Sequence, residues 1–357
     1  MEQARAAFPV LQRVAYLNAG TFGPLARETV DAMHDQARRE LEQGRSGDPY
    51  FRELRQRRAQ VRALLAQELG VEPGLVALTA STTNACAIVL AGLDLKADDE
   101  VVTTDEEHFG LLGPLHASRA RLRIARTRGL PPDQALERIV AEIGPRTRLV
   151  ALSHVSWLTG QVLPVEAVRQ ATQVPMVVDG AQSVGAIPVS AAPFDFYAVS
   201  CQKWLCGPDG TGGLYVRDPE RLRVALPSHW SRVDHAENGS FVPSPGSARF
   251  DAVPLSGPAL AGLEVALSLA PGWRFHRAQE MAERCRALLA ERFSVATPPG
   301  QSTLVSFAPG ADPAQAATRL YARGVVVRDL PGTPWLRVSC GYWTSEDDLA
   351  RLLAALQ

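Results

Sequence analysis

Lysine is nearly absent from this chain, and one of its two lysines lies in an unusual setting. All but two of the 37 basic residues are arginine, and the exceptions are Lys96 and Lys203. Lys96 lies in the charged stretch Asp-Leu-Lys-Ala-Asp-Asp-Glu, which is typical of a solvated loop. Lys203 lies in Ser-Cys-Gln-Lys-Trp-Leu-Cys-Gly-Pro, among aromatic, sulfur and glycine residues. Because a desolvated lysine can lose its proton and condense with a carbonyl, whereas arginine cannot, Lys203 is a candidate Schiff-base nucleophile.

Two further segments carry polar groups that suit a phosphorylated cofactor. Asp179 follows the apolar pair Val177-Val178, and such an acid either caps the next element or pairs with a protonated pyridine nitrogen. The run Thr79-Ala-Ser-Thr-Thr-Asn opens an apolar helix with hydroxyls and free N–H groups, either as a simple N-cap or as a seat for a phosphate. Together with Lys203, in this order along the chain, these segments fit pyridoxal phosphate.

Strand and helix patterns alternate through the middle of the chain. We expect strands at Val76–Leu78, Glu100–Thr103, Arg121–Ala125, Arg148–Ser153, Met176–Val178, Phe196–Ser200 and Gly213–Val216. We expect helices at 28–43, 50–69, Ala85–Leu93, Leu111–Arg119, Pro132–Ile143, Val165–Gln170, 256–270 and 273–293. Short apolar strands separated by helices predict an α/β fold with a mainly parallel sheet covered on both faces. Ligands of such sheets bind beyond the carboxyl ends of the strands, where Ser81, Asp179 and Lys203 fall.

A smaller α+β unit is predicted at the C-terminal end of the chain. Its expected elements are Thr303–Phe307, Pro313–Arg323, Val325–Arg328, Trp335–Val338 and Ser345–Leu356, whereas 227–258 is expected to be irregular. The predicted organisation is therefore an N-terminal segment, 1–20, that packs on the small domain, a large cofactor-binding domain, 21–270, and a small domain, 271–357.

Composition excludes several classes of protein. The chain of 357 residues is 46% hydrophobic and 21% charged with a net charge of −1, so nothing favours nucleic acid or anionic membranes. The N-terminus lacks an apolar signal core, and we expect a cytoplasmic protein without membrane helices. Five widely spaced cysteines argue against a disulfide framework, and no set of four ligands predicts a metal site.

The motifs resemble the class V aminotransferase family, which is the fold-type I group of pyridoxal phosphate enzymes. The resemblance rests on Asp179-Gly-Ala-Gln-Ser-Val-Gly-Ala and on Asp195-Phe-Tyr-Ala-Val-Ser-Cys-Gln-Lys203-Trp. It extends from Tyr16-Leu-Asn-Ala-Gly-Thr to Arg337-Val-Ser-Cys-Gly-Tyr. It implies a large domain with a seven-stranded sheet and a homodimer whose active sites lie near the interface.

The resemblance also implies a role for each matching residue. Lys203 forms the Schiff base and shuttles the α-proton, Asp179 pairs with the pyridine nitrogen, and His108 stacks on the ring. Gln182 bonds the phenolic oxygen of the ring. Arg337 binds the substrate carboxylate through its bidentate fork. The phosphate is assigned to Ser81, Thr82, Thr83, Ser200 and Gln202, the last of which replaces a more usual histidine, and the remaining substrate contacts to Asn18, His154 and Ser156.

Two positions depart from the family pattern. Trp157 replaces the asparagine usual in desulfurases, and it is either a pocket residue or a packing residue. The segment near Ala248-Arg-Phe-Asp is expected to reach the neighbouring subunit, but the threonine that contacts the neighbour's phosphate in many relatives is missing. Arg249 and Ser256 are candidates to replace that contact.

The cysteines guide the choice of reaction. Desulfurases carry a mobile thiol between the last strands of the small domain, whereas here that connection reads Arg328-Asp-Leu-Pro-Gly-Thr-Pro-Trp. Cys340 is interpreted as a buried structural thiol. The resemblance thus favours a C–S lyase that acts on cysteine, cystine or an S-substituted cysteine, including the sulfoxides of thiol-histidine biosynthesis. A desulfurase or selenocysteine lyase, a transaminase or epimerase, and a non-catalytic cofactor-binding module are the alternatives.

Overall fold

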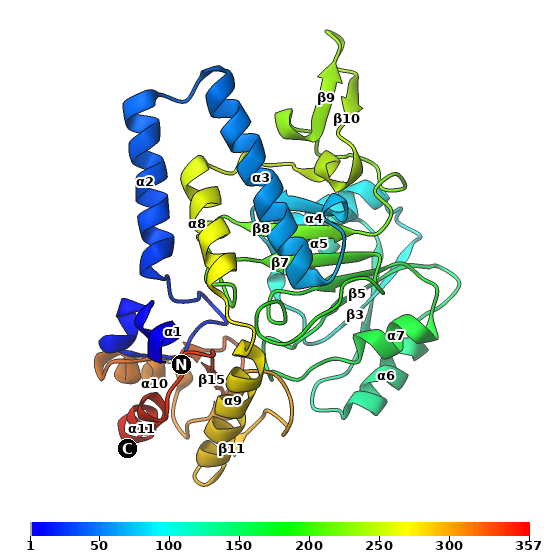
Figure 1. The fold of residues 1–357 in the computed structure, drawn as a ribbon. Coiled ribbons are helices and arrows are strands. Elements are labelled where there is room, and N and C mark those ends of the chain that lie inside the picture. Colours follow the sequence, from blue (N-terminus) through cyan, green and yellow to red (C-terminus); the bar gives the residue numbers. More distant parts are fainter. Residues whose placement is uncertain (1) are drawn as a thin grey trace.

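The centre of the structure is a seven-stranded sheet whose central strands are buried. The computed structural model describes residues 2–357, with side chains from Ala4 onward (Figure 1). The sheet order is β2-β8-β7-β6-β5-β3-β4. The strands are β2 (Val76–Thr79), β3 (Glu100–Thr104), β4 (Arg121–Ala125), β5 (Thr147–Ser153), β6 (Met176–Asp179), β7 (Phe196–Ser200) and β8 (Gly212–Val216).

The predicted fold class is confirmed. Strand β8 is antiparallel to both of its neighbours, and the β7, β6, β5, β3 and β4 pairs are all parallel. The central strands β6 and β7 are buried over their whole length because helices cover both faces of the sheet. The carboxyl ends of β5, β6 and β7 therefore meet at one edge, with Ser153 beside Asp179 and Asp179 beside Ala198.

Helices cover the two faces of the sheet unequally. One core layer joins the sheet to α3 (Gly47–Leu69), α6 (Pro132–Ala141), α7 (Val165–Ala171) and α8 (Gly257–Leu269). The other joins it to α4 (Thr82–Leu93) and α5 (Phe109–Ala117). Helix α2 (Arg27–Gln43) lies along α8 at the rim of the molecule (Figure 1). Within residues 2–357, no helix combines the length and apolar character that a membrane crossing requires.

The C-terminal part of the chain forms a second, smaller sheet. Its order is β11-β12-β15-β14, with strands β11 (Ser294–Val295), β12 (Leu304–Ala308), β14 (Arg328–Asp329) and β15 (Leu336–Ser339). Helices α9 (Arg274–Ala290), α10 (Pro313–Ala322) and α11 (Glu346–Ala355) pack on it. The single strand predicted at Val325–Arg328 is wrong, because β13 (Val325–Val326) pairs instead with β1 (Ala15–Tyr16). That pairing brings the N-terminal segment to the small sheet.

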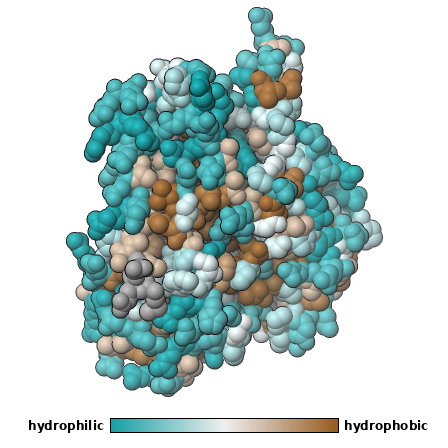
Figure 2. Space-filling view, in the orientation of Figure 1, coloured by the Kyte–Doolittle hydropathy of each residue, from teal (hydrophilic) through white to brown (hydrophobic). Residues whose placement is uncertain are grey.

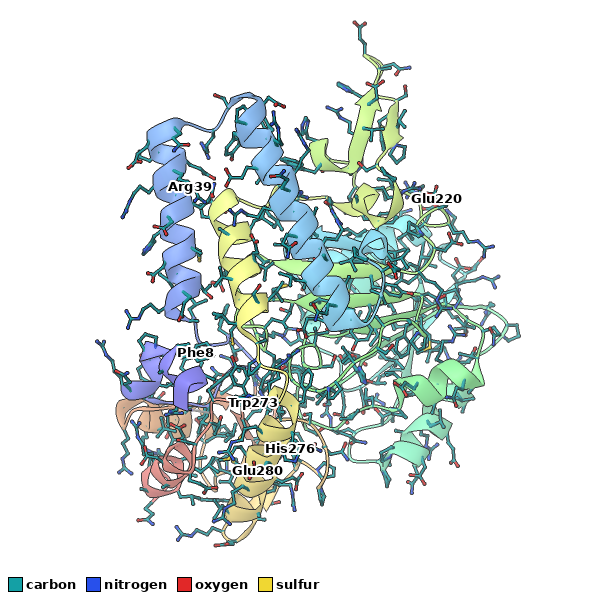
Figure 3. The ribbon with its side chains drawn as sticks, viewed as in Figure 1. Phe8, Arg39, Glu220, Trp273, His276 and Glu280 are labelled. Carbon is teal, nitrogen blue, oxygen red and sulfur yellow. The ribbon has the colours of Figure 1, made fainter. Side chains whose placement is uncertain are left out.

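Aromatic rings fill the junction where the N-terminal segment meets α9. Phe8, which follows α1 (Glu2–Ala6), lies 5.4 Å from Trp343 and 6.2 Å from Tyr342, measured between ring centroids. Trp273, at the start of α9, packs edge-on against Tyr342 at 5.9 Å. Figure 3 labels Phe8 and Trp273 on the two sides of this junction. The rings join the small sheet to the N-terminal segment through apolar contact.

A hairpin projects from the body in the region that was predicted to be irregular. Strands β9 (Arg232–His235) and β10 (Phe241–Pro243) are antiparallel, so the prediction of an irregular segment at 227–258 is wrong for this part. Val233 and Val242 are 61% and 54% exposed there. Figures 1 and 2 show the hairpin standing clear of the other elements with an apolar patch on it. A short polar-rich sequence hid the strands because an isolated hairpin has no buried face that would produce a pattern.

Candidate active site

The candidate site lies where β6 and β7 end. Asp179 is the last residue of β6, Ser200 is the last residue of β7, and Lys203 follows in the turn after it. The side chain of Asp179 is 4% exposed and its Oδ1 accepts a hydrogen bond from the backbone N–H of Ala181 at 2.8 Å. Burial raises the pKa of Asp179, and the charge of Lys203 opposes that shift. The acid and the amine therefore interact electrostatically at the sheet edge.

Lys203 is poised to lose its proton. Protein surrounds the amine, although part of the residue stays accessible. The pKa of Lys203 is lowered to about 8, mainly because the amine is buried; the charge of Asp179 opposes this shift and that of Arg337 adds to it. An amine with this pKa has a substantial neutral fraction near neutrality, and the neutral form is the nucleophile.

His108 is held neutral beside the amine. It caps α5, and its Nδ1 accepts a hydrogen bond from the backbone N–H of Gly110 at 2.9 Å. Burial lowers the pKa of His108 to about 4, and Lys203 and Arg337 lower it as well. Since Nδ1 is an acceptor, the ring proton is assigned to Nε2. A flat, uncharged ring at this place suits stacking on an aromatic cofactor.

Arg337 is a buried cation with no carboxylate partner among the described residues. It lies in β15 and is 2% exposed. Its Nη1 donates to the backbone oxygen of Trp157 at 2.8 Å, its Nη2 lies 3.4 Å from the hydroxyl of Thr21, and its Nε has no partner in residues 2–357. Burial lowers the pKa of Arg337 to about 9. Because an unpaired buried charge is costly, this guanidinium calls for an anionic ligand.

The N-terminal segment passes through the site, where Gly20 contacts both Gln182 and Arg337. The Nε2 of Gln182 donates to the backbone oxygen of Gly20 at 2.8 Å, and the Oε1 of Gln182 accepts from the indole of Trp204 at 2.9 Å. A Cβ atom at Gly20 would lie 2.8 Å from Nη2 of Arg337, so only glycine lets the backbone pass this close. Asn18 accepts from the hydroxyl of Thr21 at 2.8 Å and so shapes this segment. Gly20, Thr21 and Trp204 were missed in the sequence, where only the glycine hinted at a close approach.

Three of the residues assigned to the phosphate lie at the N-terminus of α4. The hydroxyl of Ser81 accepts from the backbone N–H of Asn84 at 3.1 Å, and the helix begins at Thr82. The first N–H groups of a helix have no acceptor inside it, and they attract anions. Thr82 is buried and Thr83 is exposed, and a Cβ atom at Gly110 would lie 2.8 Å from the hydroxyl of Thr83. The turn that carries His108 thus lies directly beside these residues.

Ser200 and Gln202 form a pair at the other side of the turn. The hydroxyl of Ser200 donates to Oε1 of Gln202 at 2.8 Å, which leaves the amide N–H groups of Gln202 available to an anion. The backbone oxygen of Gln202 accepts from Gly23 at 2.8 Å, so the N-terminal segment reaches this side as well.

The side chains of two residues assigned to the substrate, His154 and Ser156, bond to other groups of the protein. The Nδ1 of His154 is bonded to the hydroxyl of Tyr197 at 2.6 Å, in the core layer beneath α3 and α8. Alternate residues of a strand point to the same face, so the side chain of Asp179 points to the same face as that of Val177. That face carries the α4 and α5 core layer, whereas the Tyr197 partner of His154 belongs to the other layer. The hydroxyl of Ser156 donates to Glu106 and accepts from the backbone of Leu158 and Thr159. The side chains of His154 and Ser156 therefore already have hydrogen-bond partners within the protein.

Two buried acids precede His108, and neither was expected from the sequence. Glu107 accepts from the hydroxyl of Thr104 at 2.7 Å and from the backbone N–H of Ser153 at 2.9 Å, which ties β3 to β5. Burial raises the pKa of Glu107 to about 7. Glu106 holds the 156–159 turn through Ser156 and Thr159. Acids before a loop histidine resemble solvated loop residues in a sequence, so their burial was not visible.

The two residues expected to reach a neighbouring subunit make contacts within this chain. Arg249 forms an ion pair with Glu220, which Figure 3 labels on the outer surface. Ser256 caps α8 by accepting from the backbone N–H of Ala259 at 3.2 Å.

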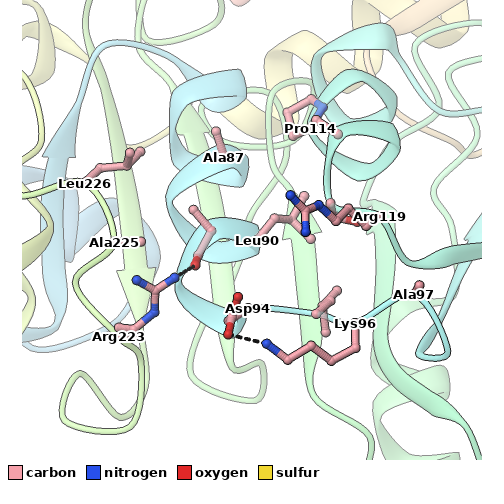
Figure 4. A pocket seen from close by; sticks show the side chains of 14 residues that line it. Ala87, Leu90, Asp94, Lys96, Ala97, Pro114, Arg119, Arg223, Ala225 and Leu226 are labelled. Atoms are coloured by element: carbon pink, nitrogen blue, oxygen red, sulfur yellow. Dashed lines mark hydrogen bonds and ion pairs between the residues drawn. The ribbon is translucent and has the colours of Figure 1, made fainter.

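The second lysine, Lys96, lies in a hollow at the C-terminal ends of α4 and α5, whereas the candidate site lies at their N-terminal ends. This hollow of about 660 Å³ has an apolar floor that includes Leu90, and Lys96, Arg119 and Arg223 lie at its rim (Figure 4). The amine of Lys96 is paired with Asp94. Within residues 2–357, no group of three or more His, Cys, Asp or Glu side chains gathers in a way that suits a metal ion.

Comparisons with known proteins agree with this geometry. The class-V aminotransferase family matches residues 15–333. Isopenicillin N epimerase of Streptomyces clavuligerus is 31% identical over 99% of this chain and 97% of its own length. A probable cysteine desulfurase of Pseudomonas aeruginosa is 31% identical over 80% of this chain and 78% of its own.

Solved structures of one protein, C-DES, superpose on nearly the whole chain. The cystine C–S lyase C-DES in complex with its product, cysteine persulfide, has a TM-score of 0.89 and 29% identity, and the match covers 98% of each chain. A C-DES variant with glycine linked to the PLP cofactor has a TM-score of 0.91 and 28% identity. The chain described here therefore belongs to the class-V aminotransferase family, and its cofactor is pyridoxal phosphate.

Proposed function

We propose that this enzyme is a C–S lyase that removes the β-sulfur group of cystine, cysteine or a related S-substituted cysteine by α,β-elimination. With one water molecule consumed, the products would be pyruvate, ammonia and a sulfur compound. The observation that carries the proposal is the burial of every thiol in the chain: Cys86, Cys201, Cys206, Cys285 and Cys340.

A desulfurase needs a thiolate that can reach the substrate sulfur, take it up as a persulfide and carry it away from the site. Burial raises the pKa of Cys201 to about 12 and raises the pKa of Cys206 still further. Contact with Cys285, together with burial, raises the pKa of Cys340. Such thiols are poor nucleophiles, and the stretch between β14 and β15 contains no cysteine. Direct elimination needs no protein thiol.

The chemistry at Cα follows from the groups around Lys203. Pyridoxal phosphate, when bound, acts as the electron sink that makes the α-proton of an amino acid acidic. Lys203 would hold the cofactor and would carry the α-proton, since burial lowers the pKa of its amine to about 8. Asp179 would hold the pyridine nitrogen protonated, and the helix α4 terminus with Ser81, Thr82 and Thr83 would bind the phosphate. Arg337 would bind the substrate carboxylate.

The similarity to C-DES supports this choice, because that protein is described as a cystine C–S lyase and matches nearly the whole chain. The full-length similarity to isopenicillin N epimerase supports a second candidate, an epimerase. Both reactions begin with loss of the α-proton, so the cofactor residues alone do not separate them.

Product identification separates the reactions. Incubation of the holoenzyme with L-cystine, L-cysteine and S-substituted cysteines should release pyruvate in equal amount to the sulfur product, without a second substrate. Alanine with a protein-bound persulfide would identify a desulfurase, and accumulation of the D-isomer without pyruvate would identify an epimerase. A requirement for a keto acid would identify a transaminase. Any of these three outcomes overturns the proposal.

We further propose that the protein is a homodimer and that the β9–β10 hairpin packs on the second copy. A two-stranded hairpin is marginally stable alone, and this one exposes Val233 and Val242. The double change Val233→Asp and Val242→Asp should produce monomers in sedimentation analysis. A matched change of exposed Tyr321→Asp on α10 should leave the mass unchanged.

A further inference from the structure

Trp157 carries a buried hydrogen-bond donor that the protein does not use. Its indole Nε1 is inaccessible to solvent and has no acceptor among residues 2–357. A buried donor that is left unpaired destabilises the protein, and an indole can only donate. Such a group in a functional site points to an acceptor that arrives with a ligand.

The location of Trp157 narrows the identity of that acceptor. Its ring lies edge-on to the ring of His108, with 5.0 Å between centroids and an interplanar angle of 86°. Its backbone oxygen accepts from Nη1 of Arg337 at 2.8 Å. Trp157 therefore contacts both the residue assigned to the cofactor ring and the residue assigned to the substrate carboxylate.

The turn that carries Trp157 is rigidly held. The hydroxyl of Thr159 donates to Glu106 at 3.0 Å, and Ser156 donates to the same carboxylate oxygen. The backbone N–H of Gly160 donates to Ser156 at 2.9 Å and closes the turn. Because these bonds are buried, the unpaired indole does not result from a loose loop.

A second unpaired donor lies on the residue that Trp157 contacts. The Nε of Arg337 is also buried without an acceptor in the described chain. Two unpaired donors on neighbouring residues, one of them cationic, suit an anion with two oxygens. We propose that Trp157 is a substrate-binding residue whose indole N–H donates to the carboxylate of the amino acid that Arg337 binds. This inference rests on the amino-acid site of the proposed function.

Trp343 provides a matched comparison within the same chain. Its indole Nε1 is likewise buried and without an acceptor in residues 2–357, and its backbone oxygen accepts from Arg5 at 2.5 Å. Arg5, however, is neutralised by Asp348 at 2.6 Å, and the Trp343 ring packs on Phe8 and Tyr342. The cation that contacts Trp343 is therefore already paired with a carboxylate, unlike Arg337.

The test compares two ligands that differ by one carboxylate, L-alanine and ethylamine. Their dissociation constants are measured on the holoenzyme from the change in the absorbance of the bound cofactor. Trp157→Phe keeps an aromatic ring and removes the N–H. It should weaken L-alanine binding about tenfold or more, the loss expected for a hydrogen bond to a charged group, and leave ethylamine binding unchanged. Trp343→Phe should change neither constant.

Three results overturn the inference: an unchanged L-alanine constant, an equal loss for both ligands, and a weaker affinity for pyridoxal phosphate with the preference for L-alanine intact. If Trp157→Phe does not fold, Trp157→Asn decides, because the amide supplies an N–H donor. A preference for L-alanine close to that of the parent supports the inference, and loss of that preference overturns it. L-alanine has no leaving group at Cβ, so failure of the lyase assay leaves this test unaffected.

Discussion

Lys203 and Lys96 are the same chemical group in two opposite surroundings. Lys96 follows the C-terminus of α4, and its side chain is 69% exposed beside Asp94, which is 61% exposed. Lys203 lies near the N-terminus of the same helix, beyond the ends of β6 and β7, where protein encloses its amine. Burial lowers the pKa of Lys203 to about 8.

The difference shows what converts an ordinary lysine into a reactive one. An exposed ion pair such as Lys96 with Asp94 contributes little to stability and keeps its amine hydrated. Lys203 has lost that hydration, and the opposing charges of Asp179 and Arg337 both act on it. Reactivity is thus a property of the enclosing site rather than of the residue.

Replacing each lysine by alanine gives the largest contrast. Lys203→Ala should abolish the visible absorbance of covalently attached cofactor and the activity, because no other amine of the site can replace it. Lys96→Ala should change neither. Absorbance spectra and initial rates check both variants, and retention of attached cofactor by Lys203→Ala would break the comparison.

Arg337 in the site and Arg119 beside the Lys96 hollow provide a similar contrast. Arg337→Lys keeps the charge but loses the bidentate fork. It should lower kcat/KM by an amount that corresponds to about 2–5 kcal/mol of lost transition-state stabilisation. Arg119→Lys, at the rim of the Lys96 hollow, should leave kcat/KM unchanged. Steady-state kinetics with cystine measure both, and equal losses in the two variants would argue against Arg337 as the carboxylate ligand.

The pH dependence of cofactor attachment tests the enclosed amine directly. Below the pKa of about 8 Lys203 is protonated and cannot attack an aldehyde, so the attachment rate should rise with pH and level off above about 8. Stopped-flow absorbance with the apoenzyme and pyridoxal phosphate measures this rate. A midpoint near the usual lysine value would mean that the amine is not desolvated.

The smallest effect is expected at the thiols. Cys340→Ala should leave sulfur release from cystine largely intact and lower the free energy of unfolding by about 1 kcal/mol, since the side chain is buried. Product assays and denaturant titrations measure the two quantities. Loss of sulfur release in a folded variant would revive the desulfurase alternative.

Much of the fold was predictable because buried strands and amphipathic helices leave periodic patterns. The strands Arg121–Ala125 and Phe196–Ser200 have the predicted boundaries, and the family resemblance pointed to the sheet edge at Asp179. The hairpin β9–β10 and the split of 325–329 between two sheets were not predictable. Their strands are two to four residues long, and pairing with distant partners rather than local pattern defines them.

The sequence by itself determined the chemistry of the reactive groups: one lysine in an apolar turn, an acid after a buried strand, and a hydroxyl-rich helix start. Only the tertiary structure decided the surroundings of these groups. It enclosed Lys203, left Arg337 without a carboxylate among the described residues, and bonded the ring of His154 to Tyr197. The physical reason is that desolvation and unpaired charge depend on which distant segments pack together, and residue types alone do not specify that packing.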